Sequence, residues 1–240
     1  MGSGVTASPT IAKWFPLAVS LDLAKGPAVS VADAVCSQVQ RFVKSEPILR
    51  QESRFPSLDE VFNSVREFSN APTQFFVLPT KTEWTVLWNN SYLCDGYDSL
   101  CYCLTHRHGL PTIHWAASDV DHVFQAGSQF IFRRRDGDLI WERSVTCIRE
   151  DERWTFYQTG TPLPEEDTSW YKERPTKNRL NESKVMTLLA RMGARPWQED
   201  FYDFTRPVVV LRRKSFPQTI DVREFAYVRH RASPNSDNRS

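Results

Sequence analysis

Two segments near the start of the chain carry apolar residues every three or four positions. The first spans residues 31–43, with Ser30 ahead of it as a candidate N-cap. The second follows Pro56, where Ser57-Leu-Asp-Glu60 has the form of a capping box. The apolar positions are Val31, Val35, Val39 and Phe42 in the first segment, and Leu58, Val61, Val65 and Phe68 in the second. This pattern predicts two N-terminal amphipathic helices.

From residue 74 onward the apolar pattern becomes that of strands. Short runs rich in aromatic and β-branched residues alternate with turn formers such as Asp95-Gly96 and Asp136-Gly137. The runs cover residues 74–78, 83–88, 112–115, 129–133, 139–148 and 154–157. Because short turns connect the later runs, the pattern predicts a meander of antiparallel strands.

Two further helices are expected between and after these strands. Asp98 and Gly109 bracket a short one that ends at His108. Asn181 caps a longer amphipathic helix, and Gly193 is its stop signal.

Two more strand-like runs follow the last helix, at residues 207–212 and 224–228. The order of elements is typical of an α+β fold: a mainly antiparallel sheet with the N-terminal helices and the C-terminal helix packed on it. We expect a single domain over residues 10–231, with disordered ends at 1–9 and 232–240, where the residues are small and polar.

Composition supports a packed fold and limits the partners. Of the 240 residues, 40% are hydrophobic, with eight Trp, seven Tyr and 15 Phe, which is enough to build a sizeable core. The 30 Lys and Arg against 29 Asp and Glu leave a net charge of +1, so no overall field attracts a polyanion and no nucleic-acid partner is expected. Arg133-Arg-Arg135 is the one local cluster that could touch a phosphate. No segment is long and apolar enough to predict a membrane span.

The cysteines point to a reducing compartment. There are five, at irregular spacing, in a chain large enough to fold without disulfides, and we expect a cytoplasmic protein. A hydrophobic stretch from Trp14 to Ala24 is interrupted by Pro16 and Asp22, so we do not expect it to be a signal peptide. The sequence leaves open whether Trp14 to Leu23 packs on the sheet as a strand.

Six residues of the types that bind metals gather between positions 94 and 114: Cys94, Cys101, Cys103, His106, His108 and His114. A zinc site is the first hypothesis. Cys101 and Cys103 are two apart on the expected helix, however, and so point about 200° away from each other. We therefore expect no metal site, and interpret the cluster as buried thiols with surface histidines.

A cysteine nucleophile is the enzymatic alternative. Cys94 precedes the N-terminus of the expected helix, where the helix dipole lowers the pKa of a thiol. A histidine and an acid such as Asp95, Asp98 or Asp119 could complete the site. No motif around Cys94 demands catalysis, so a cysteine-based or carboxylate-based enzyme remains the second hypothesis.

Carboxylates also cluster at Glu150-Asp-Glu152 and at Glu165-Glu-Asp167. Such runs are usually solvated faces. The second run differs in its setting, because prolines stiffen the chain before it and aromatic residues follow it. Aromatic anchors beside charges are typical of protein interfaces, and a stiff loop is cheaper to order on binding. The predicted partner-binding residues are Glu165, Glu166, Asp167, Trp170 and Tyr171.

Three stretches resemble a bacterial family of small cytosolic proteins, some of which act as immunity proteins beside secreted toxins. They are Trp84 to Cys101, Arg153 to Tyr171, and Asn178-Arg-Leu180 before a helix. The resemblance spans roughly residues 75 to 205, and Gly-Thr-Pro-Leu-Pro-Glu-Glu-Asp-(x)3-Tyr is its most specific part. It implies binding to a cognate toxin and carries over no catalytic residue.

The resulting expectation is a protein-binding immunity protein rather than an enzyme. Gly-rich phosphate loops, Gly-x-Ser-x-Gly and His-Glu-x-x-His are all missing, so no cofactor is expected. The sequence leaves the toxin, the binding face and the oligomeric state open.

Overall fold

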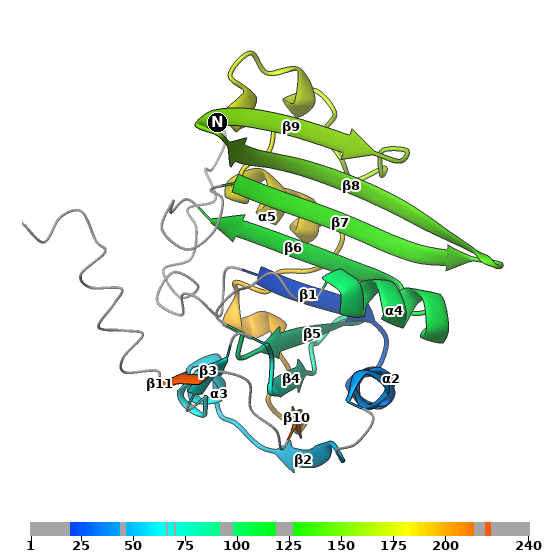
Figure 1. Cartoon of the computed structure of the whole chain (residues 1–240), viewed down its shortest axis with the longest axis vertical. Coiled ribbons are helices and arrows are strands. Elements are labelled where there is room, and N and C mark those ends of the chain that lie inside the picture. Colours follow the sequence, from blue (N-terminus) through cyan, green and yellow to red (C-terminus); the bar gives the residue numbers. More distant parts are fainter. Residues whose placement is uncertain are drawn as a thin grey trace, which may run out of the picture.

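The protein is built on a nine-stranded antiparallel sheet with helices on both faces (Figure 1). The computed structural model describes residues 20–43, 47–65, 67–69, 71–91, 98–118, 127–213 and 219–221. The strands follow the order β2-β10-β4-β5-β1-β6-β7-β8-β9 across the sheet. They are β1 (Ser20–Lys25), β2 (Leu49–Ser53), β4 (Gln74–Leu78), β5 (Trp84–Asn89), β6 (Thr112–Ser118), β7 (Gly127–Asp136), β8 (Leu139–Glu150), β9 (Arg153–Thr159) and β10 (Val208–Arg212).

The remaining described elements are short strands and helices. A two-stranded sheet pairs β3 (Glu67–Ser69) with β11 (Thr219–Asp221). The α-helices are α2 (Ala28–Phe42), α3 (Leu58–Asn63), α4 (Asp98–His108) and α5 (Glu182–Arg191). Single turns of 3₁₀ helix are η1 (Trp170–Lys172), η2 (Thr176–Asn178) and η3 (Glu199–Phe201). None of the helices in these ranges is long and apolar enough to cross a membrane.

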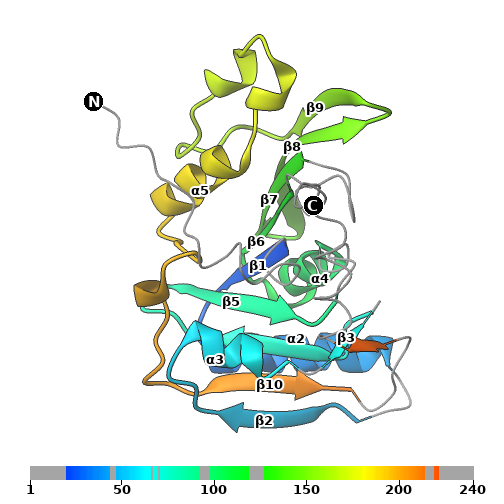
Figure 2. The same ribbon diagram turned by 90° about the vertical axis from the view of Figure 1, so that its left-hand side faces the viewer.

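Side chains alternate between two cores, one on each face of the sheet. In β1, Leu21 and Leu23 join the larger core, which α3 and α5 cover, whereas Ala24 joins the smaller core under α2 and α4. Figure 2 shows α5 and α4 on opposite sides of the sheet. The same alternation in β8 places Arg143 on the α5 face and Glu142 on the α4 face. Each face therefore receives its own buried charged residues.

The predicted α+β fold with a mainly antiparallel sheet is confirmed. Local signals mark the helix ends as expected. The Ser57 hydroxyl accepts a hydrogen bond from the Glu60 N–H (3.2 Å), and Asn181 Oδ1 accepts one from the Lys184 N–H (3.0 Å). Gly109 and Gly193, which follow α4 and α5, have φ values of +69° and +78°, where glycine is favoured.

Two helix boundaries differ from the prediction. Helix α2 begins at Ala28 after an extended Pro27, one turn before the expected start. Helix α3 ends at Asn63, and Phe68, expected on its apolar face, lies in β3 instead. The Ser69 N–H donates to the Asn90 carbonyl oxygen (2.9 Å), so pairing with a distant segment draws the chain out of the helix.

Four described strands lie outside the predicted set: β1, β2, β3 and β11. The sequence left open whether Trp14 to Leu23 packs on the sheet as a strand. Residues 20–23 of this segment do so, because they belong to β1 in the middle of the sheet. Strand β2 is short and exposed and has no apolar alternation. The predicted strand at 224–228 and the predicted disordered ends fall outside the described residues.

Candidate functional site

The five residues predicted to bind a partner lie in one irregular segment, residues 160–174, which we call the 160–174 loop. It follows β9, includes η1, and folds over the end of the sheet on the α5 side (Figure 2). Tyr171 packs on Phe156 of β9, with ring centroids 5.3 Å apart. The loop is therefore part of the folded body rather than a projection from it.

Arg143 of β8 reaches from the sheet into this loop, and its side chain is only 1% exposed. A guanidinium has five N–H donors, and Arg143 uses all five. Nε and Nη2 donate to the two carboxylate oxygens of Glu166 (2.8 and 2.7 Å). Nη1 donates to the carbonyl oxygens of Thr159 (3.0 Å) and Gly160 (3.1 Å), and Nη2 also donates to Gln158 Oε1 (3.0 Å).

Glu166 is equally well satisfied, and its side chain is fully buried. In addition to Arg143, its carboxylate accepts hydrogen bonds from the Leu163 N–H (2.8 Å) and the Tyr171 hydroxyl (2.6 Å). Burial raises the pKa of this carboxyl, but the hydrogen bonds from Arg143, Leu163 and Tyr171 outweigh it, so the pKa lies below its ordinary value. We refer to Arg143, Gln158, Glu166 and Tyr171 as the Arg143 cluster.

This network fixes the conformation of the loop. Breaking a buried ion pair leaves an uncompensated charge and costs about 3–5 kcal/mol, so a loop conformation that separated Arg143 from Glu166 would be strongly disfavoured. Because both partners are fully hydrogen-bonded, the network meets the condition under which a buried polar cluster specifies one structure.

The three other predicted residues lie nearer the surface of the loop. Asp167 accepts hydrogen bonds from the Ser169 hydroxyl (2.6 Å) and N–H (3.1 Å), and these lower the pKa of its carboxyl. The Trp170 ring is half-buried and lies near two cationic groups of α5, the Lys184 ammonium (5.7 Å) and the Arg191 guanidinium (5.4 Å). The structure thus brings all five predicted residues together, with Glu165, Asp167 and Trp170 partly accessible and Glu166 and Tyr171 turned inward.

The role of Arg143 was missing from the sequence analysis, although a signal was present. In the predicted strand 139–148, Arg143 alternates with Val145 and Cys147 and so falls on the face that enters the core. A charged residue at a core position requires a buried partner. The sequence did not reveal that Glu166 is this partner, 23 residues later.

The predicted Cys and His cluster divides between the surface and the α4 face. Cys101 is buried and Cys103 is half-buried, as expected for residues two apart on a helix. His106 and His108 are exposed, as predicted, and the ring of His106 stacks on Tyr102. The interpretation as a surface histidine is wrong for His114, which is 3% exposed. Cys94, Asp95 and Asp119 lie outside the described residues.

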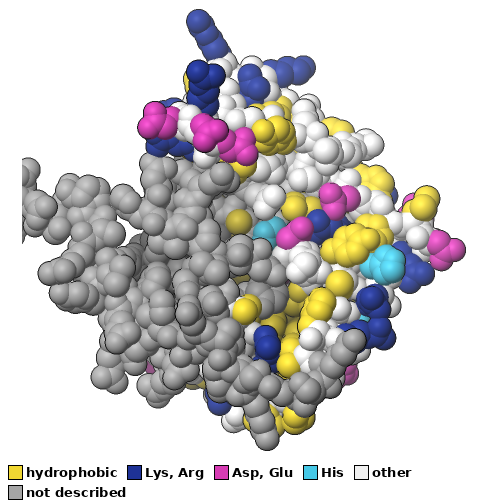
Figure 3. All heavy atoms as spheres, viewed as in Figure 1, with side chains coloured by type: hydrophobic (Ala, Val, Ile, Leu, Met, Phe, Trp, Pro, Cys, Tyr) yellow, Lys and Arg dark blue, Asp and Glu magenta, His cyan; other side chains and the backbone are white. Residues whose placement is uncertain are grey.

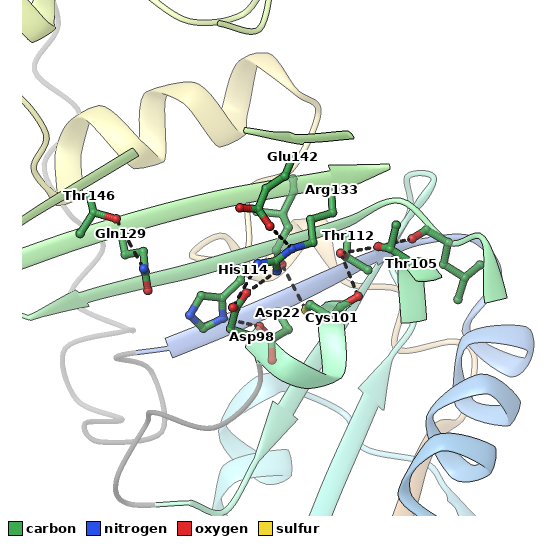
Figure 4. Close-up of polar contacts among 12 residues, drawn as sticks. Asp22, Asp98, Cys101, Thr105, Thr112, His114, Gln129, Arg133, Glu142 and Thr146 are labelled. Atoms are coloured by element: carbon green, nitrogen blue, oxygen red, sulfur yellow. Dashed lines mark hydrogen bonds and ion pairs between the residues drawn. The ribbon is translucent and has the colours of Figure 1, made fainter. Parts of the chain in front are cut away.

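His114 belongs to a second charged network, which we call the His114 cluster: Asp22, Asp98, Cys101, His114, Arg133 and Glu142 (Figure 4). Asp22, His114 and Arg133 are buried, whereas Asp98 and Glu142 are partly exposed. His114 Nδ1 lies 2.7 Å from Asp22 Oδ1. Arg133 pairs with both carboxylate oxygens of Asp98 and donates from Nε to Glu142 Oε2 (2.6 Å). The cluster links four strands to the first residue of α4.

The thiol in this cluster is not arranged as a nucleophile. Burial, the charge of Asp22 and a hydrogen bond to Asp22 raise the pKa of Cys101 well above its ordinary value. Burial lowers the pKa of the His114 imidazole, but the hydrogen bond to Asp22 outweighs burial, so the pKa lies above its ordinary value. An activated cysteine needs its base beside the sulfur and a lowered pKa. The Cys101 thiol instead lies 3.9 Å from the Ile113 carbonyl oxygen, and the His114 imidazole is paired with Asp22.

The two remaining charged runs lie in the meander, the acidic one where β8 turns into β9 and the arginine one near the end of β7. Figure 3 shows acidic side chains grouped where β8 turns into β9, the turn that contains Asp151 and Glu152. Arg133 is buried, while Arg134 lies over the Trp141 ring (5.0 Å) and Arg135 donates to the Gly137 carbonyl oxygen (2.8 Å). The arginine run is therefore not one exposed basic patch.

A cleft of about 350 Å³ opens between η2, the start of α5 and the adjacent strands. Trp154, Lys177, Ser128 and Met186 are among its lining residues. Within the described ranges, no group of three or more His, Cys, Asp or Glu side chains is placed to hold a metal ion.

Comparison with known proteins adds no relative: no protein-family model matches the chain, and no curated protein or solved structure does.

Proposed function

We propose that this chain is a protein-binding protein that neutralises a cognate bacterial toxin by stoichiometric binding, with the 160–174 loop as its docking surface. The observation that carries the proposal is the Arg143 cluster. It holds an irregular surface loop in one conformation through a fully satisfied buried ion pair between Arg143 and Glu166.

The physical argument is preorganisation. Replacing a buried ion pair by apolar residues of similar volume is often neutral or stabilising, so stability alone gives a weak reason for this one. A fixed loop pays little ordering entropy when it meets a partner, and connecting loops on rigid scaffolds often carry function. The Arg143 cluster supplies this fixed conformation, and so lowers the entropy cost of binding through the loop.

The accessible chemistry of the loop suits a protein partner. Trp170 offers an aromatic ring near two cationic groups, and Asp167 offers a carboxylate beside it. Interface hot spots are rich in Trp and Arg, whereas a nucleic-acid site would require a more uniformly basic surface. The resemblance to immunity proteins and the cysteine content support a toxin as the partner and the cytoplasm as the compartment.

The test is protection of cells. The product of the neighbouring gene is expressed in a bacterial host with the unmutated protein or with the Asp167→Lys/Trp170→Ala variant, and survival and complex stoichiometry are measured. Loss of a hot spot costs about 2 kcal/mol or more, so the variant is expected to bind about 30-fold more weakly and to protect poorly.

The matched control is Asp138→Lys/Leu139→Ala, which changes the same kinds of residue at the exposed tip of the β7–β8 hairpin. This control is expected to protect as well as the unmutated protein. Equal protection by both variants would remove the 160–174 loop as the docking surface, and failure of the unmutated protein to bind an active toxin would remove the proposed function.

A further inference from the structure

Strand β2 forms one edge of the nine-stranded sheet and is open to solvent. Of the described strands, only β10 pairs with it (Figures 1 and 2). Residues 49–52 are all exposed, Leu49 at 50%, and Ser53 is half-buried. An uncovered edge strand presents unpaired backbone N–H and C=O groups that can accept another strand.

The charges on this edge are symmetric about Gln51. Arg50 and Glu52 lie opposite Leu211 and Val209 of β10, so both point toward the α2 face, whereas Gln51 points toward the other face. If two copies of β2 pair antiparallel with Gln51 opposite itself, Arg50 of each copy lies opposite Glu52 of the other. Opposite charges directly across a strand pair are stabilising, and like charges are destabilising.

Shifted registers lose this complementarity. The nearest registers that keep each side chain on the same face of the sheet are centred one residue earlier or later. In these registers Arg50 lies opposite Arg50, or Glu52 lies opposite Glu52. Only the register centred on Gln51 pairs all five residues of β2 and matches both charges. We propose that β2 is a homodimer interface in which a second copy of this chain adds its own β2 in this register.

The flanking residues fit such a contact. Arg50 forms ion pairs with Asp33 of α2 and, at 3.7 Å, with Glu52 of its own strand, so both side chains lie together beside the edge. The Ile48 N–H donates to Gln40 Oε1 (3.2 Å) and so ties the start of β2 to the end of α2, where Phe42 is 63% exposed. Charged residues on an edge usually prevent pairing with unrelated strands. Here the same charges favour a second copy of the chain.

The interface is small, and this sets the expected strength. Interfaces below about 1,200 Å² belong to the weak, transient class, so the dimer should form at high protein concentration. The proposal concerns the edge of the sheet far from the 160–174 loop, and it stands or fails independently of the toxin-binding function.

Disulfide trapping tests the register directly. Opposed residues in an antiparallel pair have Cα atoms about 4.5–5.5 Å apart, within the range of a disulfide. The Gln51→Cys variant is therefore expected to form a covalent dimer on mild oxidation. In the proposed register, residue 49 of one copy and residue 49 of the other are four residues apart along the strand pair, about 13 Å, and the same holds for residue 53. Leu49→Cys or Ser53→Cys alone should therefore not cross-link. An equimolar mixture of those two variants should cross-link.

The unmutated protein, which retains its five cysteines, serves as the blank, and peptide mapping locates each disulfide. The proposal is overturned if Gln51→Cys gives no more dimer than the blank, or if the two single controls cross-link as well as their mixture.

Sedimentation of charge variants gives a second, non-covalent measurement. Arg50→Glu and Glu52→Arg each set like charges against each other in the dimer, and each is expected to raise the dissociation constant at least about tenfold. Mixing the two variants restores both opposite-charge pairs and should restore dimerisation. Equal dimerisation by the unmutated protein, each variant and the mixture would contradict the proposed register.

Discussion

Each face of the sheet carries a charged cluster with a buried arginine, and the two clusters have different structural roles. On the α5 face, the Arg143 cluster joins the sheet to a loop with little regular structure of its own. On the α4 face, the His114 cluster joins four strands to the first residue of a helix that already packs on an apolar core. The comparison teaches that similar chemistry supports an irregular loop in one place and reinforces regular structure in the other.

The clusters also differ in the group that titrates. The pKa of the Glu166 carboxyl lies below its ordinary value, and the pKa of the His114 imidazole lies above its ordinary value. The Arg143 cluster should therefore weaken at acidic pH, and the His114 cluster should weaken at alkaline pH.

The largest expected effect is the loss of Arg143. Arg143→Met leaves the fully buried Glu166 carboxylate without its cation and should lower the free energy of unfolding by about 3–5 kcal/mol. Urea denaturation measures this as a fall in the midpoint at constant slope. Adding Glu166→Leu should recover part of the loss, because the unpaired charge is removed. Arg134→Met, at an exposed position, is the control, and an Arg143→Met effect no larger than the control's would contradict the account.

Gly160 offers a backbone test of the same cluster. Its φ is +77°, and a Cβ there would lie 2.1 Å from the Glu142 carbonyl oxygen. Gly160→Ala should therefore cost more than the roughly 1 kcal/mol of a left-handed alanine alone. Gly137 is the matched control. Its φ is +60°, and no atom lies within 4 Å of the position that a Cβ would occupy. Equal thermal shifts for the two alanine variants would mean that the loop backbone can relax freely.

The pH dependence of stability separates the clusters by direction. Because the folded pKa of Glu166 is depressed from 4.5, its contribution is complete above about pH 4.5 and is lost as the pH falls through the folded value. Because the folded pKa of His114 is raised from 6.5, its contribution is complete below about pH 6.5 and is lost as the pH rises through the folded value.

Variants of similar size assign the acidic and alkaline limbs of the curve of unfolding free energy against pH to these two residues. Urea unfolding across a pH series should show a flatter acidic limb for Glu166→Gln and a flatter alkaline limb for His114→Gln. If Glu166→Gln altered the alkaline limb, or His114→Gln the acidic limb, the assignment of the titrating groups would be wrong.

The smallest effect concerns thiol reactivity in the His114 cluster. Cys101 is buried with a raised pKa, so it should react with a thiol reagent only after unfolding, while half-buried Cys103 on the same helix reacts in the native protein. Mass spectrometry of the labelled peptides distinguishes the two sites. Rapid native-state labelling of Cys101 would contradict its burial in the His114 cluster.

The sequence predicted the elements that local signals determine. Glycine stops marked the ends of α4 and α5, the Asn181 cap marked the start of α5, and the alternation of apolar residues marked the meander. Asp98, the expected N-cap of α4, is instead the first residue of that helix, and its carboxylate pairs with Arg133. The sequence did not predict β2, which is exposed and pairs with the distant strand β10, or the early end of α3. Those features depend on contacts between distant segments.

The candidate site was predictable only in part. Aromatic and acidic residues identified the 160–174 loop, but residue types alone do not tell which side chains turn inward. Glu166 is buried because Arg143 lies beneath it, and that pairing joins two segments far apart in the sequence. The same limitation hid His114, whose partner Asp22 lies 92 residues earlier.

The central claim is that the 160–174 loop is held in one conformation in the free protein, and hydrogen exchange tests it most directly. The Leu163 N–H, which donates to Glu166, and the Glu166 N–H, which donates to the Leu163 carbonyl oxygen, should be strongly protected. Glu166→Ala should abolish that protection while the amides of β7 and β8 remain protected. Unprotected exchange at Leu163 and Glu166 in the unmutated protein would contradict the account.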